Sequence, residues 1–196
     1  MRMAAALLAG TTALGGPPGP ATLEAARGRV ISKAAAAGQP FPLPQPEVRV
    51  FKARHTLELW AQGCRVATYD AALGHRGLAD KVREGDHLTP EGRFTLCSRN
   101  DRSAFHLFLG ISYPDAKAAE RGFRSGLITA AQRARILRAA RQGTCPPWDT
   151  PMGGTVGLHG GGTASDWTWG CIALADPHIE ELWVACPVGT PVVIAP

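Results

Sequence analysis

The chain has 196 residues, of which 45% are hydrophobic, and a formal net charge of +5. This apolar content and modest charge exclude a largely disordered chain, and the length suits one domain with a terminal extension. The mild positive charge favours an anionic polymer as partner, but no basic run with interleaved aromatic residues occurs, so we do not expect nucleic-acid binding.

Residues 1–45 are predicted to be a leader and linker. Met1-Arg2-Met3 precedes an alanine-rich apolar run and then small residues, which resembles a secretory signal. We therefore expect export to the periplasm or cell envelope; a flexible leader or a misplaced start codon is the alternative. No stretch reaches the roughly 18 apolar residues that a transmembrane helix needs. Residues 21–37 predict a short helix with Thr22 as N-cap, and the alternating prolines after it predict an extended linker, so the domain boundary is placed at residue 46.

Residues 46–196 are predicted to form a mainly β domain. Alternating apolar residues indicate strands around 48–50, at 56–61 and at 65–70, with Gln62-Gly63 as a hairpin turn. Further strands are expected at 94–96, 105–109, 156–158 and 192–194. The pattern favours a twisted sandwich or partly closed barrel of about seven to ten strands.

Two helical segments are expected within this domain. Residues 115–142 predict an inserted helical segment, in which Thr129 and Gln132 fit a capping box and Gly143 ends the helix. This segment either shapes a binding cleft or only packs on the domain with a solvated basic face. A C-terminal helix is predicted with Asp176 as N-cap and a proline directly after it.

The most informative segment is glycine-rich and contains a histidine and a cysteine. His159 lies within Gly157–Gly162, and Cys171 follows in Thr168-Trp169-Gly170-Cys171. A cysteine nucleophile needs a nearby base, and glycines beside it let a substrate approach the main chain. We therefore predict Cys171 as nucleophile and His159 as general base. Because the base precedes the nucleophile, a papain-like enzyme is disfavoured.

The His-Gly dipeptide followed by Thr-x-Gly-Cys-Ile resembles the signature of the L,D-transpeptidase catalytic domain family, the YkuD-type fold. Other segments resemble the family in the same order: 72–74, 89–94, 153–159 and 189–192. The resemblance covers roughly residues 46 to 196 and implies a YkuD-like β-sandwich or partly closed barrel. It is greatest to the branch with an Asp-Trp-Thr-x-Gly-Cys-Ile-Ala-Leu pattern.

Two departures from the family pattern concern the site. Many members have arginine where this chain has Ala173, which implies that the donor peptide is read differently. The interval between His159 and Cys171 is also shorter than in many members, which implies a trimmed loop over the site.

The resemblance implies a peptidoglycan L,D-transpeptidase that needs no cofactor. Cys171 would attack the L-centre carbonyl of the diamino acid in a tetrapeptide stem, releasing the terminal D-alanine. An amine from a neighbouring stem, or from a wall-linked lipoprotein, would then resolve the thioester. Two alternatives stay open: hydrolysis of the same thioester by an L,D-carboxypeptidase or amidase, and a non-catalytic wall-binding module.

Neighbouring residues are given supporting roles. The backbone N–H groups of Gly170 and Cys171, with Trp169 as a third, are the expected oxyanion donors. Thr168 either orients the histidine or bonds to the local backbone. Gly160 and the two glycines after it are expected to turn the chain sharply beside the site. Trp167 either lines the donor groove or fills core, and Asp166 either recognises the acceptor amine or is simply solvated.

The remaining cysteines bear on redox state and metal binding. If Cys171 is free, the other four permit two disulfides in three pairings, or stay as buried thiols: Cys64, Cys97, Cys145 and Cys186. His159, Cys171 and Cys186 are candidate zinc ligands, but no Cys-x-x-Cys or His-x-x-x-His spacing occurs. We therefore expect no metal.

Overall fold

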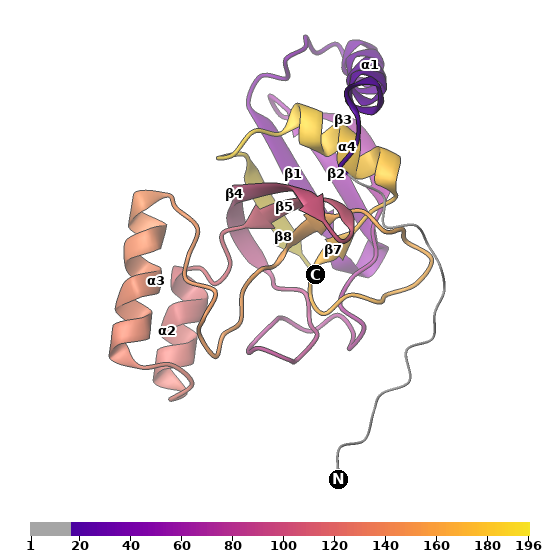
Figure 1. Cartoon of the computed structure of the whole chain (residues 1–196). Helices are drawn as coiled ribbons and strands as arrows, with labels where there is room; N and C mark the ends of the chain where they lie inside the picture. Colours follow the sequence, from indigo (N-terminus) through magenta and orange to yellow (C-terminus); the bar gives the residue numbers. More distant parts are fainter. Residues whose placement is uncertain (1–16) are drawn as a thin grey trace.

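An eight-stranded mixed sheet forms the centre of the computed structural model, which describes residues 17–196 (Figure 1). The strands are β1 (Pro46–Phe51), β2 (Thr56–Ala61), β3 (Cys64–Asp70), β4 (Gly92–Ser103), β5 (His106–Ile111), β6 (Gly157–His159), β7 (Ile172–Ala173) and β8 (Pro191–Ala195). They lie in the order β3-β2-β1-β8-β4-β5-β6-β7. The signal-like stretch expected at the N-terminus lies outside the described residues.

The long strand β4 curls the sheet. Its first residues, 92–95, pair with β8, and the residues from Leu96 onward pair with β5. The chain that leaves edge strand β3 then reaches the opposite edge: Ala72 and Ala173 exchange two backbone hydrogen bonds of 2.9 and 2.8 Å. The sheet is therefore a half-barrel whose two edges meet at two isolated bridges, Ala72–Ala173 and Gly74–Thr168, which confirms the predicted mainly β, partly closed barrel.

The hydrophobic core lies between the curled sheet and helix α4 (Asp176–Ala185). Strands β1 and β2 contribute their buried aliphatic positions to it, and Ile179 and Leu182 of α4 are fully buried. Each such side chain contributes about 1.5–3 kcal/mol on burial. The core thus supports β5 and β6, the strands that lead to the functional residues.

The predicted hairpin between β2 and β3 is confirmed. Gln62 and Gly63 both have positive φ, at 47° and 76°, which matches the twist of a two-residue hairpin turn. The strand expected at 94–96 is longer than predicted, and β7 was not predicted, because two residues carry no period-2 signal.

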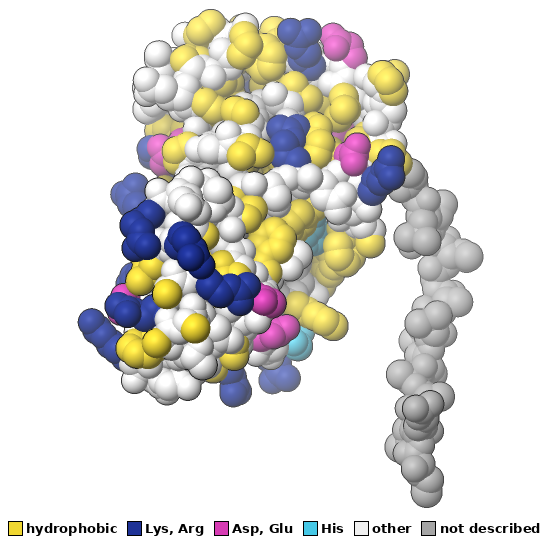
Figure 2. Space-filling view, turned by 60° about the vertical axis from the view of Figure 1, so that its left-hand side comes forward, with side chains coloured by type: hydrophobic (Ala, Val, Ile, Leu, Met, Phe, Trp, Pro, Cys, Tyr) yellow, Lys and Arg dark blue, Asp and Glu magenta, His cyan; other side chains and the backbone are white. Residues whose placement is uncertain are grey.

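The inserted helical segment is two helices, α2 (Ala116–Arg124) and α3 (Ala130–Gln142), at the side of the sheet (Figure 1). The capping box of Thr129 and Gln132 and the left-handed C-cap Gly143 are both as predicted. Figure 2 shows Lys and Arg side chains gathered over α2 and α3. The exposed ones are Lys117, Arg124, Arg135, Arg138 and Arg141.

Helix α1 (Pro20–Ala36) packs against α4 rather than trailing in a linker. Arg29 Nε donates to Glu181 at 2.9 Å and Arg29 Nη2 donates to Glu180 at 3.0 Å. The predicted N-cap Thr22 is wrong: Gly19 is the N-cap, because Pro20 has the fixed φ that suits the first helical position. None of the helices within residues 17–196 is long and apolar enough to cross a membrane.

The predicted N-cap of the C-terminal helix is also wrong by one residue. Ala175 is the N-cap and Asp176 is the first helical residue. The Asp176 carboxylate instead accepts a hydrogen bond of 2.8 Å from the N–H of Gly161. This side chain therefore ties the start of α4 to the glycine-rich loop.

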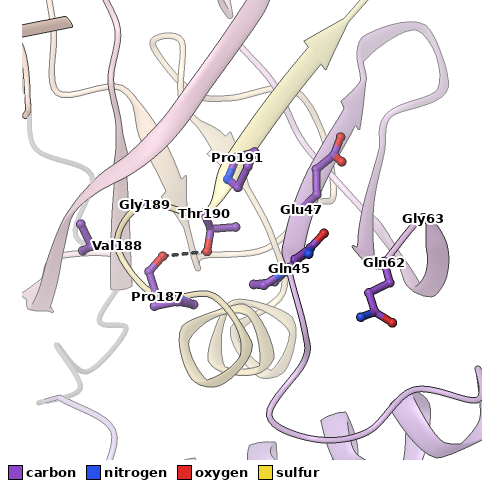
Figure 3. A pocket seen from close by; sticks show the side chains of 10 residues that line it. Gln45, Glu47, Gln62, Gly63, Pro187, Val188, Gly189, Thr190 and Pro191 are labelled. Atoms are coloured by element: carbon purple, nitrogen blue, oxygen red, sulfur yellow. Dashed lines mark hydrogen bonds between the residues drawn. The ribbon is translucent and has the colours of Figure 1, made fainter. Parts of the chain in front are cut away.

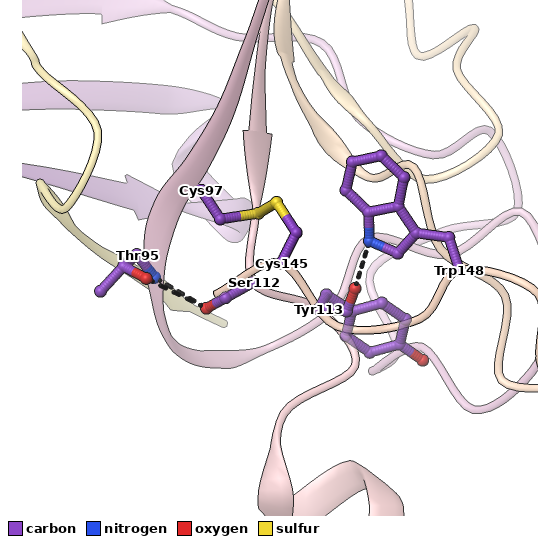
Figure 4. Close-up of a disulfide and its surroundings, with 6 residues drawn as sticks. All are labelled: Thr95, Cys97, Ser112, Tyr113, Cys145 and Trp148. Atoms are coloured by element: carbon purple, nitrogen blue, oxygen red, sulfur yellow. Dashed lines mark hydrogen bonds between the residues drawn. A yellow bond between two sulfur atoms is a disulfide. The ribbon is translucent and has the colours of Figure 1, made fainter. Parts of the chain in front are cut away.

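One disulfide, Cys97–Cys145, joins β4 to the loop after α3 (Figure 4). In the same region the Trp148 Nε1–H donates to the Tyr113 carbonyl at 3.1 Å. Of the four remaining cysteines only these two pair within residues 17–196, whereas Cys64 is an exposed thiol and Cys186 is buried. The disulfide fixes the helical insertion onto the sheet.

Candidate active site

The register of β6 and β7 brings the predicted nucleophile and base together. In this parallel pair Leu158 lies opposite Ile172 and His159 opposite Ala173, so Cys171 comes opposite Gly157. Alternation along the strands places Cys171, Gly157 and His159 on one face. Cys171 and His159 both line a cleft of about 700 Å³. The sequence-predicted pair therefore shares one site.

The tautomer of His159 follows from its backbone neighbour. Its Nδ1 lies 2.7 Å from the carbonyl oxygen of Gly160. Because a carbonyl only accepts, Nδ1 carries the proton, and in the neutral ring Nε2 is left with a lone pair. A histidine held this way accepts a proton at Nε2, as a general base must.

Aromatic rings surround the His159 imidazole. The Phe105 ring stacks on it with centroids 4.8 Å apart, and the Trp167 ring meets it edge-on at 5.4 Å. Burial lowers the pKa of His159, against the opposing effect of its hydrogen bond to Gly160. The base is therefore neutral, and able to accept a proton, over a wider pH range than an exposed histidine.

The Cys171 thiol is half-buried and donates to the carbonyl of Thr155 at 3.5 Å. Burial raises the pKa of Cys171, while a hydrogen bond from the Gly157 backbone and the charge of Lys81 act in the opposite direction. The resting site is thus a neutral thiol beside a neutral imidazole. A reaction at this thiol would therefore need its proton to pass to a base such as His159.

Thr168 holds the turn that carries the nucleophile. Its hydroxyl donates to the Cys171 carbonyl at 2.7 Å and accepts from the Gly170 N–H at 3.1 Å. Of the two predicted roles, the structure therefore shows local backbone bonding. Gly170 has φ of 127°, and a Cβ there would lie 2.7 Å from the Leu88 carbonyl oxygen, so only glycine fits.

The predicted set of oxyanion donors needs correction. The Gly170 N–H is already used by the Thr168 hydroxyl. Among residues 17–196, the N–H groups of Trp169 and Cys171 make no hydrogen bond, so both remain available as main-chain donors beside the thiol. The Trp169 side chain is 75% exposed and stacks on the His87 ring at 5.3 Å, forming part of the cleft wall.

The other predicted site residues separate into two groups. Gly160 supplies the carbonyl that fixes His159, and Trp167 lines the cleft with its Nε1–H bonded to the Gly162 carbonyl. Asp166 does not line the cleft: its carboxylate accepts from the Leu73 N–H at 2.7 Å and contacts His55 Nε2 at 2.9 Å. The Asp166 carboxylate, for which the sequence allows an acceptor contact or plain solvation, therefore has two partners within the protein.

The three candidate zinc ligands do not come together at the cleft. Position 173 places no charge there either. Cys186 is fully buried in the core, where burial raises its pKa to about 12. Ala173 is fully buried in β7. The cleft therefore contains His159 and Cys171 without the third candidate ligand, Cys186.

Sequence reasoning missed several residues that line the cleft. Lys81, Glu84 and His87 come from the loop between β3 and β4, and Phe105 comes from the tip of the β4–β5 hairpin. Their sequence neighbourhood carries no motif, because the contacts with Cys171 and His159 arise only when the sheet curls. A second depression, of about 590 Å³, lies around Gln45, Glu47 and Thr190 (Figure 3). None of its lining residues is a cysteine or histidine.

Comparison with protein-family models identifies the chain. The model described as YkuD, L,D-transpeptidase catalytic domain, matches residues 45–194. The protein belongs to the L,D-transpeptidase catalytic domain family. This confirms the resemblance drawn from the His159 and Cys171 motif, and it makes the protein an enzyme of that family. No curated protein matches the sequence.

Several solved structures are similar to the chain at low sequence identity. The helical cell shape determining protein Pgp2 from Campylobacter jejuni matches with a TM-score of 0.51 and 20% identity, over 76% of this chain and 46% of that one. An L,D-transpeptidase from Mycobacterium smegmatis matches with a TM-score of 0.47 and 12% identity, over 78% of this chain and 59% of that one. An L,D-transpeptidase from Xylanimonas cellulosilytica matches with a TM-score of 0.46 and 14% identity, over 96% of this chain and 100% of that one. The chain thus spans about half the length of Pgp2.

Proposed function

We propose that this L,D-transpeptidase family member cross-links peptidoglycan stem peptides through a thioester on Cys171, with His159 as the base. The observation that carries this proposal is the cleft shared by the Cys171 thiol and the His159 imidazole, whose Nδ1 is bonded to Gly160. Family membership supports a stem peptide as the substrate class. The signal-like N-terminus supports action in the cell envelope.

Acylation begins with the Cys171 thiol and the carbonyl of the L-centre diamino acid. The thiol proton passes to His159 Nε2 while Sγ bonds to the carbonyl carbon, which becomes tetrahedral. The Cys171 N–H supports the negative oxygen. The carbon–nitrogen bond then breaks, His159 gives its proton to the leaving amine, and D-alanine departs, with the acyl group left on Sγ as a thioester.

Deacylation reverses these roles with a new amine. An amino group of a neighbouring stem, or of a wall-linked lipoprotein, gives its proton to His159 and attacks the thioester carbonyl. The carbon–sulfur bond breaks, Sγ regains the proton, and an amide links the two peptides. Water in place of the amine would give a tripeptide instead.

The test is incubation of the protein with disaccharide-tetrapeptide muropeptides, followed by mass spectrometry of the products. We expect cross-linked dimers and free D-alanine, both lost in Cys171→Ala. Cys64→Ala is the matched control, because this exposed thiol lies on β3 and outside the cleft. Tripeptides without dimers would show a hydrolase, and unchanged substrate would refute the proposal.

A further inference from the structure

Lys81 is a buried cation beside the nucleophile. Among the residues that line the cleft in the described part of the chain, it is the one lysine or arginine, and its side chain is only 4% exposed. A Cβ placed on Gly170 would lie 3.7 Å from Lys81 Nζ. The ammonium group therefore lies next to the residue that precedes Cys171. Its charge reaches the thiol, where it favours the thiolate.

Two acceptors hold the Lys81 ammonium in place, and its third N–H donor stays available. It donates to the Arg83 carbonyl at 3.1 Å and to Asp86 Oδ1 at 2.8 Å. An ammonium has three N–H donors, so one remains for a ligand in the cleft. A buried N–H donor without an acceptor costs free energy, which an acceptor oxygen on a ligand would recover.

Asp86 is the counter-ion of Lys81, and backbone donors fix its carboxylate in place. The N–H groups of Val82, Arg83 and Leu88 donate to its carboxylate at 2.7, 2.9 and 3.1 Å. Burial acts to raise the pKa of Asp86, but these bonds and the one from Lys81 hold that pKa below its ordinary value. Asp86 is thus a fixed counter-ion that orients Lys81.

Two basic side chains outside the cleft donate hydrogen bonds that hold the loop on either side of Lys81. The fully buried Lys52 Nζ donates to the carbonyls of Ala79 and Thr89, each at 2.9 Å. Arg121 Nη2 donates to the Lys81 carbonyl itself at 2.6 Å, and Arg121 Nη1 to Asp80 at 2.7 Å. Lys81 is therefore preorganised, as a recognition group should be.

We propose that Lys81 binds the terminal carboxylate of the donor stem peptide and so selects donors that end in a free acid. This inference rests on the proposed function. The leaving residue of such a donor carries its carboxylate directly beside the amide nitrogen that is expelled, so the cation that reads it must lie close to Cys171. Lys81 satisfies this requirement, whereas Ala173 brings no charge and Glu84, the other charged cleft residue, has the wrong sign.

Calorimetric binding to non-reacting variants tests the inference. In Cys171→Ala, a disaccharide-tetrapeptide with a free D-alanine carboxylate should bind more tightly than the same compound with a carboxamide terminus. Adding Lys81→Met should weaken binding of the free acid by about 10- to 100-fold and abolish the preference over the amide. Lys117→Met is the matched control, because this exposed lysine lies on α2 outside the cleft.

The outcomes separate the inference from the proposed function. If the double variant still prefers the free acid, or binds it as tightly as Cys171→Ala does, Lys81 is not the carboxylate receptor, while the transpeptidase donor stands. If Cys171→Ala binds neither compound, the donor assignment falls, and the inference with it. Lys81→Gln retains N–H donors for Arg83 and Asp86 without the charge, so it should reproduce the loss if Lys81→Met does not fold.

Discussion

The Thr168 hydroxyl donates a 2.7 Å hydrogen bond to the carbonyl of Cys171, three residues ahead of it. The same oxygen accepts from the N–H of Gly170. One side chain therefore sets the backbone path on which Cys171 lies. Placement of reacting groups to within a fraction of an ångström is a large part of enzymatic rate.

Thr168→Val should reduce kcat by about 10- to 100-fold, because the turn around Cys171 loses both hydrogen bonds. Thr190→Val is the matched control: Thr190 is equally buried and its hydroxyl donates to the Pro187 carbonyl at 2.7 Å, away from the cleft (Figure 3). Both variants should lose about 1–2 kcal/mol of unfolding free energy. Equal losses of activity in the two variants would contradict a role of Thr168 at the nucleophile.

Gly170→Ala should inactivate the protein and destabilise it more than Gly189→Ala. Both glycines have positive φ, but a Cβ at Gly170 meets the Leu88 carbonyl at 2.7 Å, whereas one at Gly189 has nothing within 4 Å. The Gly189 variant should therefore lose about 1–2 kcal/mol from backbone strain alone. Denaturant unfolding measures the loss of stability, and the rate of Cys171 alkylation reports the change at the site. Similar results for the two variants in both measurements would refute the steric argument.

Phe105→Ala should shift the acid limb of the pH–rate profile to higher pH. His159 acts as a base only when neutral, and burial under the Phe105 ring lowers its pKa. Removing the ring hydrates the imidazole and raises the His159 pKa toward its ordinary value, so activity is lost sooner as pH falls. Phe123→Ala, which truncates a similarly exposed ring on α2, should leave the profile in place.

Replacing Cys97 and Cys145 by serine should lower the free energy of unfolding by about 2–4 kcal/mol, because the bond closes a long loop in the unfolded chain. The two residues are 48 apart in sequence. Neither lines the cleft, so cross-linking at low temperature should persist. Urea unfolding of the double variant and of the reduced protein should agree; a midpoint equal to that of the oxidised wild type would contradict this role of the disulfide.

The features that were predicted correctly depend on local chemistry. The Gln62-Gly63 turn, the capping box at Thr129 and the family resemblance drawn from the His159–Cys171 motif each follow from residues close in sequence. Those that were missed depend on contacts between distant segments. Strand β7 exists because it pairs with β6 and with Ala72, and Lys81 reaches Cys171 only through the curl of the sheet. The engaged N–H of Gly170 could not be foreseen, since the two possible roles of Thr168 look the same in sequence.

The most direct test of the account is the intact mass of the protein after brief mixing with a disaccharide-tetrapeptide. A thioester on Cys171 predicts a mass increase equal to the disaccharide-tripeptide acyl group, with one D-alanine released per adduct. The adduct should map to the Cys171 peptide, disappear in hydroxylamine, form in Cys64→Ala and be absent from Cys171→Ala. Release of D-alanine by Cys171→Ala at the wild-type rate, without any adduct on the wild-type protein, would contradict the mechanism.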